Sequence, residues 1–170
     1  MQKRAAWELD VFNKLRKSGS LGAKSVDYIA KRKVKLSFGA QPTGAKWTLK
    51  GMLLGPPEVI VNSKQMAGVK SAKDNWSLSV IAHEVKHYQQ GMLVALSVYG
   101  ELEAWQLQMR LLRDLGSPPK NQALKAIEKL KLSHDPKVLR EAARLMKEYS
   151  PEYRVDLLPL NPITYFGRKL

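Results

Sequence analysis

The segment from residue 78 to 90 contains the pattern His83-Glu84-x-x-His87 inside an otherwise apolar, helix-forming sequence. Residues at positions i and i+4 of an α-helix lie on one face, so a helix here would bring the two imidazoles together. That spacing matches the geometry of a tetrahedral zinc site, and Glu84 would lie beside the open position where water binds. The alternative is an amphipathic helix whose histidines only form hydrogen bonds or face solvent.

Composition restricts which side chains can bind such a metal. The chain of 170 residues has no cysteine and three histidines, so thiolate sites and a disulfide framework are excluded. The metal ligands must therefore be histidines and carboxylates. With 44% hydrophobic and 26% charged residues, the chain is long enough for one domain with a core and too short for two ordinary ones.

The formal net charge of +14 lies mainly at the two flanks of the chain. Residues 1–35 carry ten Lys or Arg and three acidic residues, and residues 120–147 carry eight and three. Residues 71–105, around the motif, carry two Lys and four acidic residues. The net charge suggests a polyanionic partner such as nucleic acid or a membrane surface. The simpler explanation is lysines scattered over solvated helix faces.

No targeting or membrane segment is visible. The basic N-terminus is followed by Glu8 and Asp10 before an apolar signal region could form. The longest apolar run, residues 92–96, is too short to span a bilayer. We therefore expect a soluble cytoplasmic protein with no membrane span.

Hydrophobic periodicity predicts helices and short strands in separate blocks. Helices are expected over residues 5–17, 23–31, about 75–90, 101–113, 121–132 and 136–149. Strands are expected over residues 34–38, 47–54 and 58–62. The Pro-rich tail from Ser150 should be extended or irregular.

These elements predict an α+β fold. We expect a small antiparallel sheet of about three strands, packed on the motif helix and the next helix, with further helices at both ends. The whole chain, 1–170, would form one domain: N-terminal helices (1–33), a core with the motif (34–115), and C-terminal helices with the tail (118–170).

A third metal ligand should come from a helix packed against the motif helix. Glu101 and Glu103 follow His87 by 14 and 16 residues, and two antiparallel helices joined at Gly91 could return either one to the metal. They point to different faces of a helix, so only one should bind.

With Glu101-Leu102-Glu103-Ala104-Trp105 following the first motif, the chain resembles the gluzincin metallopeptidases, in particular their minimal members, over roughly residues 47 to 112. That family has H-E-x-x-H on one helix and often E-x-x-A-D on the next, where the leading Glu binds zinc. The resemblance implies zinc bound by His83, His87 and Glu101, with Glu103 as the runner-up. Trp105 replaces the Asp that commonly orients the first histidine, so another group must do so.

The resemblance also implies the activity, which is zinc-dependent hydrolysis of a peptide or protein substrate. Glu84 would act as general base and then as general acid. In such enzymes an edge strand before the motif helix binds the substrate backbone, a role that Val59, Ile60 and Val61 fit by position. The alternative for these residues is a plain core strand.

Two parts of the implied mechanism stay open. The donor that stabilises the oxyanion has four candidates, namely Tyr88, Tyr99, Tyr149 and Tyr153, each of which could instead be a packing residue. Minimal gluzincins are known for latency, so a tail carboxylate such as Asp156 could occupy the open metal position. The competing function is a basic nucleic-acid-associated or interaction protein with a non-catalytic metal site.

Overall fold

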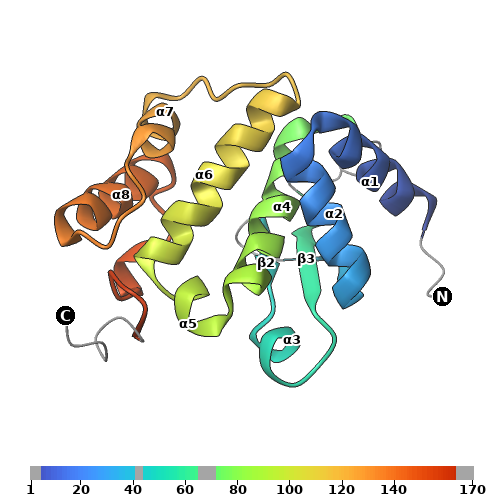
Figure 1. Cartoon of the computed structure of the whole chain (residues 1–170), viewed down its shortest axis with the longest axis horizontal. Helices are drawn as coiled ribbons and strands as arrows, with labels where there is room; N and C mark the ends of the chain where they lie inside the picture. Colours follow the sequence, from blue (N-terminus) through green and yellow to red (C-terminus); the bar gives the residue numbers. More distant parts are fainter. Residues whose placement is uncertain (1–4, 41–43, 65–71, 164–170) are drawn as a thin grey trace.

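The computed structural model describes residues 5–40, 44–64 and 72–163, and it confirms the α+β fold class (Figure 1). The longer helices are α1 (Ala6–Ser18), α2 (Ser20–Arg32), α4 (Asn75–Gln90), α6 (Val98–Asp114), α7 (Gln122–Lys129) and α8 (Pro136–Tyr149). The described ranges also contain two short helices, α3 (Leu49–Leu53) and α5 (Met92–Ala95), and a 3-10 turn (Val155–Leu157). Within the described ranges, no helix has the length and apolar content to cross a bilayer.

The helices on either side of the proposed site begin and end at clear capping residues. At the start of α4 the Asp74 carboxylate accepts a hydrogen bond from the backbone N–H of Ser77, at 3.2 Å. Gly91, with φ of 76°, ends this helix in a conformation that glycine tolerates. The Ser97 hydroxyl accepts from the Gly100 N–H at the start of α6, at 3.1 Å. These caps explain why the motif helix was predictable from sequence.

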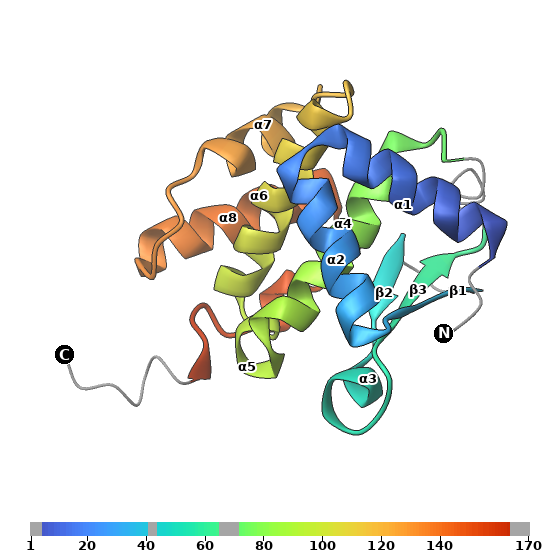
Figure 2. The ribbon, with the colours of Figure 1, turned by 45° about the vertical axis from the view of Figure 1, so that its right-hand side comes forward.

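The sheet is mixed, which corrects the expectation of a fully antiparallel one. Strands β1 (Lys35–Gly39), β2 (Ala45–Trp47) and β3 (Glu58–Asn62) lie in the order β1-β3-β2 (Figure 2). β2 pairs with β3 antiparallel, but β1 pairs with β3 in parallel. Short connections suggested pairing between strands that are consecutive in sequence. Instead the most apolar strand, β3, takes the central position, which buries Val59 and Val61 completely.

The expected strand over residues 47–54 is mostly a helix. Only its first residue, Trp47, belongs to β2, and α3 follows at once. The Thr48 hydroxyl accepts from the N–H of Gly51 at 3.1 Å and so begins this helix. Leu53 and Leu54 are 54% and 88% exposed, so they do not form the buried face of a strand.

Helices α4 and α6 lie antiparallel at the boundary between two hydrophobic clusters. The first cluster comes chiefly from α1, α2, the sheet and α4, and the second from α6, α7, α8 and the tail. At one end of the helix pair, Asn75 donates to the carbonyl of Leu115 at 2.9 Å. At the other end, Gln90 donates to the carbonyl of Gly100 at 2.8 Å. These bonds fix which residues of the two helices face each other.

Gly100 permits the close approach that sets the start of α6. A Cβ atom at this position would lie 2.0 Å from the carbonyl oxygen of Val94 in α5. Only glycine therefore fits where α5 packs on the first turn of α6. Glu101 follows directly, so this contact helps to decide the direction in which its carboxylate points.

The described part of the tail is irregular apart from its 3-10 turn, and it packs against the start of α6. The backbone N–H groups of Val98 and Tyr99 donate to the carbonyls of Pro159 and Leu160, at 2.9 and 3.0 Å. These are N–H groups that the first turn of a helix leaves without intrahelical partners. The tail is thus part of the fold around α6.

The Tyr88 hydroxyl joins the sheet to α4. It accepts from the backbone N–H groups of Thr48 and Glu58, at 3.0 and 2.9 Å, and donates to the Glu58 carbonyl at 2.8 Å. The Tyr28 hydroxyl donates a hydrogen bond of 3.0 Å to the carbonyl of Tyr88, and it also interacts with the Arg32 side chain.

We predict that Tyr88→Phe lowers the free energy of unfolding by about 2 to 3 kcal/mol, because two backbone N–H groups lose their acceptor. The matched control is Tyr28→Phe, which removes the hydrogen bond to the Tyr88 carbonyl and should cost about 1 kcal/mol. Urea unfolding followed by circular dichroism measures both variants. Equal losses for the two would contradict the role assigned to Tyr88.

Candidate metal centre

His83, His87 and Glu101 form a buried group between α4 and α6. The two histidines lie one turn apart on α4, and Glu101 lies in the first turn of α6. His83 Nε2 is 3.5 Å from Glu101 Oε2, and His87 Nε2 is 3.6 Å from Glu101 Oε1. One potential ligand atom from each residue lies within 4.8 Å of the other two, so the group could hold a metal ion.

The geometry and chemistry of this group fit a divalent transition metal. A tetrahedral zinc ion with bonds of about 2.0 to 2.1 Å has ligand atoms roughly 3.4 Å apart. The two nitrogen–oxygen separations of 3.5 and 3.6 Å are close to that value. Two imidazoles and a carboxylate suit Zn²⁺ and its neighbours among the divalent transition metals.

Gln90 sets the tautomer of His87. Its side-chain nitrogen donates to the Gly100 carbonyl and to the Glu103 carboxylate, so the orientation of the amide is determined. The amide oxygen then faces His87 Nδ1 at 3.0 Å, and because it can only accept, Nδ1 carries the proton. In the neutral ring this leaves Nε2 with its lone pair toward Glu101, as a metal ligand requires.

Glu103 does not join the group. Its carboxylate lies 2.6 Å from Lys86 Nζ and accepts from Gln90 at 2.9 Å. Of the two glutamates considered from the sequence, the structure therefore brings Glu101 to the histidines, while Glu103 holds Gln90 in place. Gln90 was missed by sequence reasoning, although its position three residues after His87 places it on a neighbouring part of the same helix face.

His83 is oriented by packing. Among the residues that the structure describes, none forms a hydrogen bond with its buried Nδ1. The Trp105 ring stands edge-on to the imidazole, with centroids 5.6 Å apart and an interplanar angle of 89°. The contact that Trp105 makes with His83 is therefore a ring contact.

The tail residue that reaches the group is Tyr153. Its hydroxyl donates a hydrogen bond to Glu101 Oε2. Burial raises the pKa of Tyr153 well above its usual value, and the nearby Glu101 carboxylate adds to this, so the phenol stays protonated. Asp156, the tail carboxylate considered from the sequence, instead lies at the surface, 3.3 Å from Lys147 Nζ.

Of the other tyrosines considered as donors, Tyr88 and Tyr99 make contacts elsewhere, whereas Tyr149 lies at the site. Tyr88 is occupied by the backbone groups of the sheet. Tyr99 stacks on His134, with ring centroids 4.2 Å apart, and this third histidine bonds to Asn161 away from the metal group. Tyr149 lines the cavity at the site together with Tyr153.

Glu84 lies on the wall of a cavity of about 360 Å³, next to His83. Its carboxylate accepts a hydrogen bond from the backbone N–H of Trp47, at 2.9 Å. Burial raises the pKa of Glu84 to about 7; His87 opposes this shift and Glu101 reinforces it. Burial also acts to raise the pKa of Glu101, but the neighbouring histidines hold it below its usual value.

The expected substrate-binding role of Val59, Ile60 and Val61 does not agree with the structure. β3 pairs with a strand on both sides, so it has no free edge for a substrate strand. The edge strand nearest the site is β2, whose Trp47 ring lies 6.0 Å from the ring of His87. The expectation was wrong because it took residues 58–62 for an edge strand, whereas β3 is the central strand of the sheet.

Comparison with known proteins finds no matching family model, curated protein or solved structure. The resemblance to gluzincins therefore rests on the residues of the two motifs.

We predict that Glu101→Gln weakens zinc binding at least about 100-fold, because it removes one of three ligands. Glu103→Gln makes the same chemical change two residues away. Outer residues that bond a ligand directly typically contribute about 10- to 100-fold. Glu103 reaches His87 only through Gln90, so its loss should weaken binding by about tenfold at most. Competition with a chromophoric chelator measures both affinities. Equal losses, or a larger loss for Glu103→Gln, would contradict the assignment of Glu101.

Proposed function

We propose that this protein is a zinc-dependent peptidase of the gluzincin type. The observation that carries the proposal is the convergence of His83, His87 and Glu101 beside a cavity that Glu84 lines. Three protein ligands leave one coordination position for water or substrate, which is typical of catalytic zinc sites. Structural zinc sites usually have four protein ligands.

The proposed chemistry divides between the metal and Glu84. When bound, zinc supplies a Lewis acid and lowers the pKa of a water molecule to about 7. Glu84 accepts the proton of the attacking water and delivers it to the leaving amine. The hydrogen bond from Trp47 holds the Glu84 carboxylate on the cavity wall, and so limits the positions it can take.

In this proposal the substrate is an extended peptide that lies along the edge of β2. Strand addition to a sheet edge uses backbone hydrogen bonds and so accepts many sequences. β2 is an edge strand, and its Trp47 N–H points to Glu84 instead of to β3. A peptide on this edge would therefore pass close to the proposed general base.

The tail contributes to the proposed site through Tyr153. Its hydroxyl bonds to Glu101, and the tail residues 150, 152 and 153 form part of the cavity wall. Of the four tyrosines considered, Tyr149 and Tyr153 stay candidates for stabilising the oxyanion. A tail that both bonds a ligand and walls the cavity suits a latent enzyme, so latency through this segment belongs to the proposal.

We predict that Glu84→Gln lowers the rate of peptide hydrolysis by about 10²- to 10⁴-fold while zinc stays bound, because only the proton acceptor is lost. Glu148→Gln, the same change at an exposed site on α8, is the control and should keep full activity. Hydrolysis of an internally quenched peptide by zinc-loaded protein measures the rates. Undiminished hydrolysis by Glu84→Gln would exclude Glu84 as the general base.

A further inference from the structure

The cavity beside the metal group extends along the groove between α4 and α6. Its helical walls are formed by Trp76, Val80, His83 and Glu84 of α4 and by Trp105 and Gln108 of α6. Trp76 precedes His83 by seven residues, and Gln108 follows Glu101 by seven. Because the two helices are antiparallel, Trp76 and Gln108 share the end of the groove that lies about 10 Å from the metal group.

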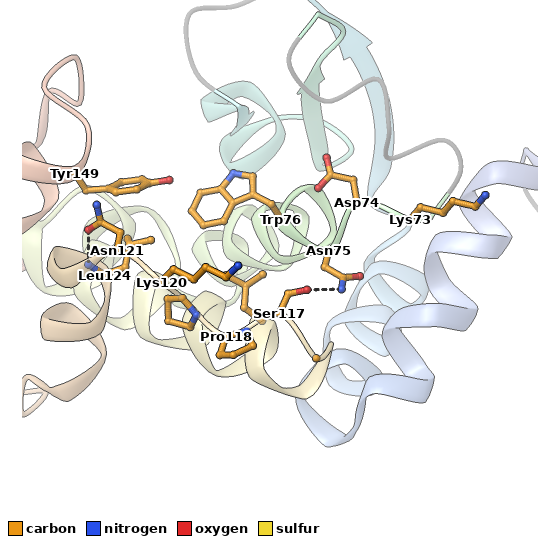
Figure 3. A pocket seen from close by; sticks show the side chains of 13 residues that line it. Lys73, Asp74, Asn75, Trp76, Ser117, Pro118, Lys120, Asn121, Leu124 and Tyr149 are labelled. Atoms are coloured by element: carbon orange, nitrogen blue, oxygen red, sulfur yellow. Dashed lines mark hydrogen bonds between the residues drawn. The ribbon is translucent and has the colours of Figure 1, made fainter.

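The far end of this cavity is bounded by two aromatic rings. The rings of Trp76 and Tyr149 lie with centroids 5.8 Å apart. Both residues also line a second pocket, of about 590 Å³, near the start of α4 (Figure 3). The ring pair thus lies between the two spaces, and it gives the first cavity an aromatic boundary of two rings tilted by 48°.

Gln108 places an unpaired amide group at this end of the cavity. Its side chain is buried, with 2% of the residue exposed. Its buried amide nitrogen has no hydrogen-bond partner anywhere in the described ranges. Buried polar groups are normally hydrogen-bonded, and an unpaired one destabilises a fold. The nitrogen is closed to a water-sized molecule in this conformation, so the Gln108 side chain must turn toward the cavity before a bound ligand can accept from it.

The carboxylates among the described residues that line this cavity are those of Glu84 and Glu152. Glu84 is next to the metal group, and Glu152 is exposed on the tail. No Lys or Arg is among the described residues that line this space. A carboxylate side chain that reached Gln108 would lose its water without gaining an opposite charge, which is unfavourable. A lysine or arginine side chain has no atom that could accept from the amide. The amide and the aromatic walls suit a neutral ring with a polar tip.

We propose that Gln108 determines specificity by binding a large neutral substrate side chain whose tip accepts a hydrogen bond, with tyrosine as the best fit. The tyrosine ring packs against the aromatic walls, and its hydroxyl accepts from the Gln108 amide. A phenylalanine fills the same space but leaves the amide unpaired. The inference rests on the proposed function for cleavage, but the side chain can bind without being cleaved.

The test measures binding by zinc-loaded protein that carries Glu84→Gln, so that peptides are not cleaved. The probes are blocked peptides of alanine and glycine that contain a single Tyr or a single Phe. Calorimetry should show the Tyr peptide binding about tenfold more tightly, the effect of one hydrogen bond. When the protein also carries Gln108→Met, the two peptides should bind with about equal affinity. This substitution should also raise the melting temperature of the peptide-free protein, because the unpaired amide is removed.

Gln106→Met is the matched control on the same helix. The Gln106 amide donates to the carbonyls of Ile127 and Leu130, at 3.1 and 2.6 Å, so it already has partners. This variant should lower the melting temperature and keep the tenfold preference. The contrast separates loss of a ligand contact from a general effect of methionine on α6.

Equal affinity for the two peptides, no binding of either, or a preference that survives Gln108→Met would overturn the inference. Zinc-loaded wild-type protein tests the proposed function separately. If it cleaves neither peptide although binding depends on Gln108, the proposed function fails and this inference stands. If it cleaves both at the same rate and Glu84→Gln binds both equally, the inference fails and the proposed function stands.

Discussion

The antiparallel packing of α4 on α6 is the constraint on which the proposed site depends. Both histidines lie on α4 and the carboxylate lies on α6, so the group exists only while the two helices keep their register. Hydrogen bonds from Asn75 and Gln90 hold the two ends of this helix pair. Each helix also belongs chiefly to a different hydrophobic cluster, so the register is supported from both sides.

Within this frame, the site is a connected set of polar groups. Burial alone would disfavour the charge of Glu101, but the two histidines and the Tyr153 hydroxyl stabilise it. A chain of contacts runs from Lys86 through Glu103 and Gln90 to His87 and fixes the tautomer of that ring. Such outer contacts hold metal ligands in position before the metal binds, which reduces the cost of ordering them.

The sequence predicted what depends on local pattern and missed what depends on contacts far apart in the chain. Helix α4 was predictable because Asp74, Gly91 and a periodic apolar face mark its ends and its buried side. The His83–His87 pairing follows from helix geometry alone. In contrast, the parallel pairing of β1 with β3 requires the last strand to insert between the first two, and nothing local encodes that order.

The same division applies to the site residues. The motif limited the third ligand to Glu101 or Glu103, and the register of the two helices decides which one faces the histidines. The contact of Tyr153 with Glu101 spans 52 residues, so only the folded tail reveals it. Likewise, the unpaired amide of Gln108 has meaning only once the groove between α4 and α6 is known.

X-ray absorption spectroscopy of the zinc-loaded protein reports the atoms bound to the metal and so tests whether His83, His87 and Glu101 hold it. We expect four nitrogen or oxygen neighbours at about 2.0 to 2.1 Å, with outer-shell scattering from two imidazoles. His83→Ala and His87→Ala should each remove one imidazole contribution. A shell of six oxygen atoms without imidazole scattering, or a spectrum unchanged by both substitutions, would contradict the proposed metal centre.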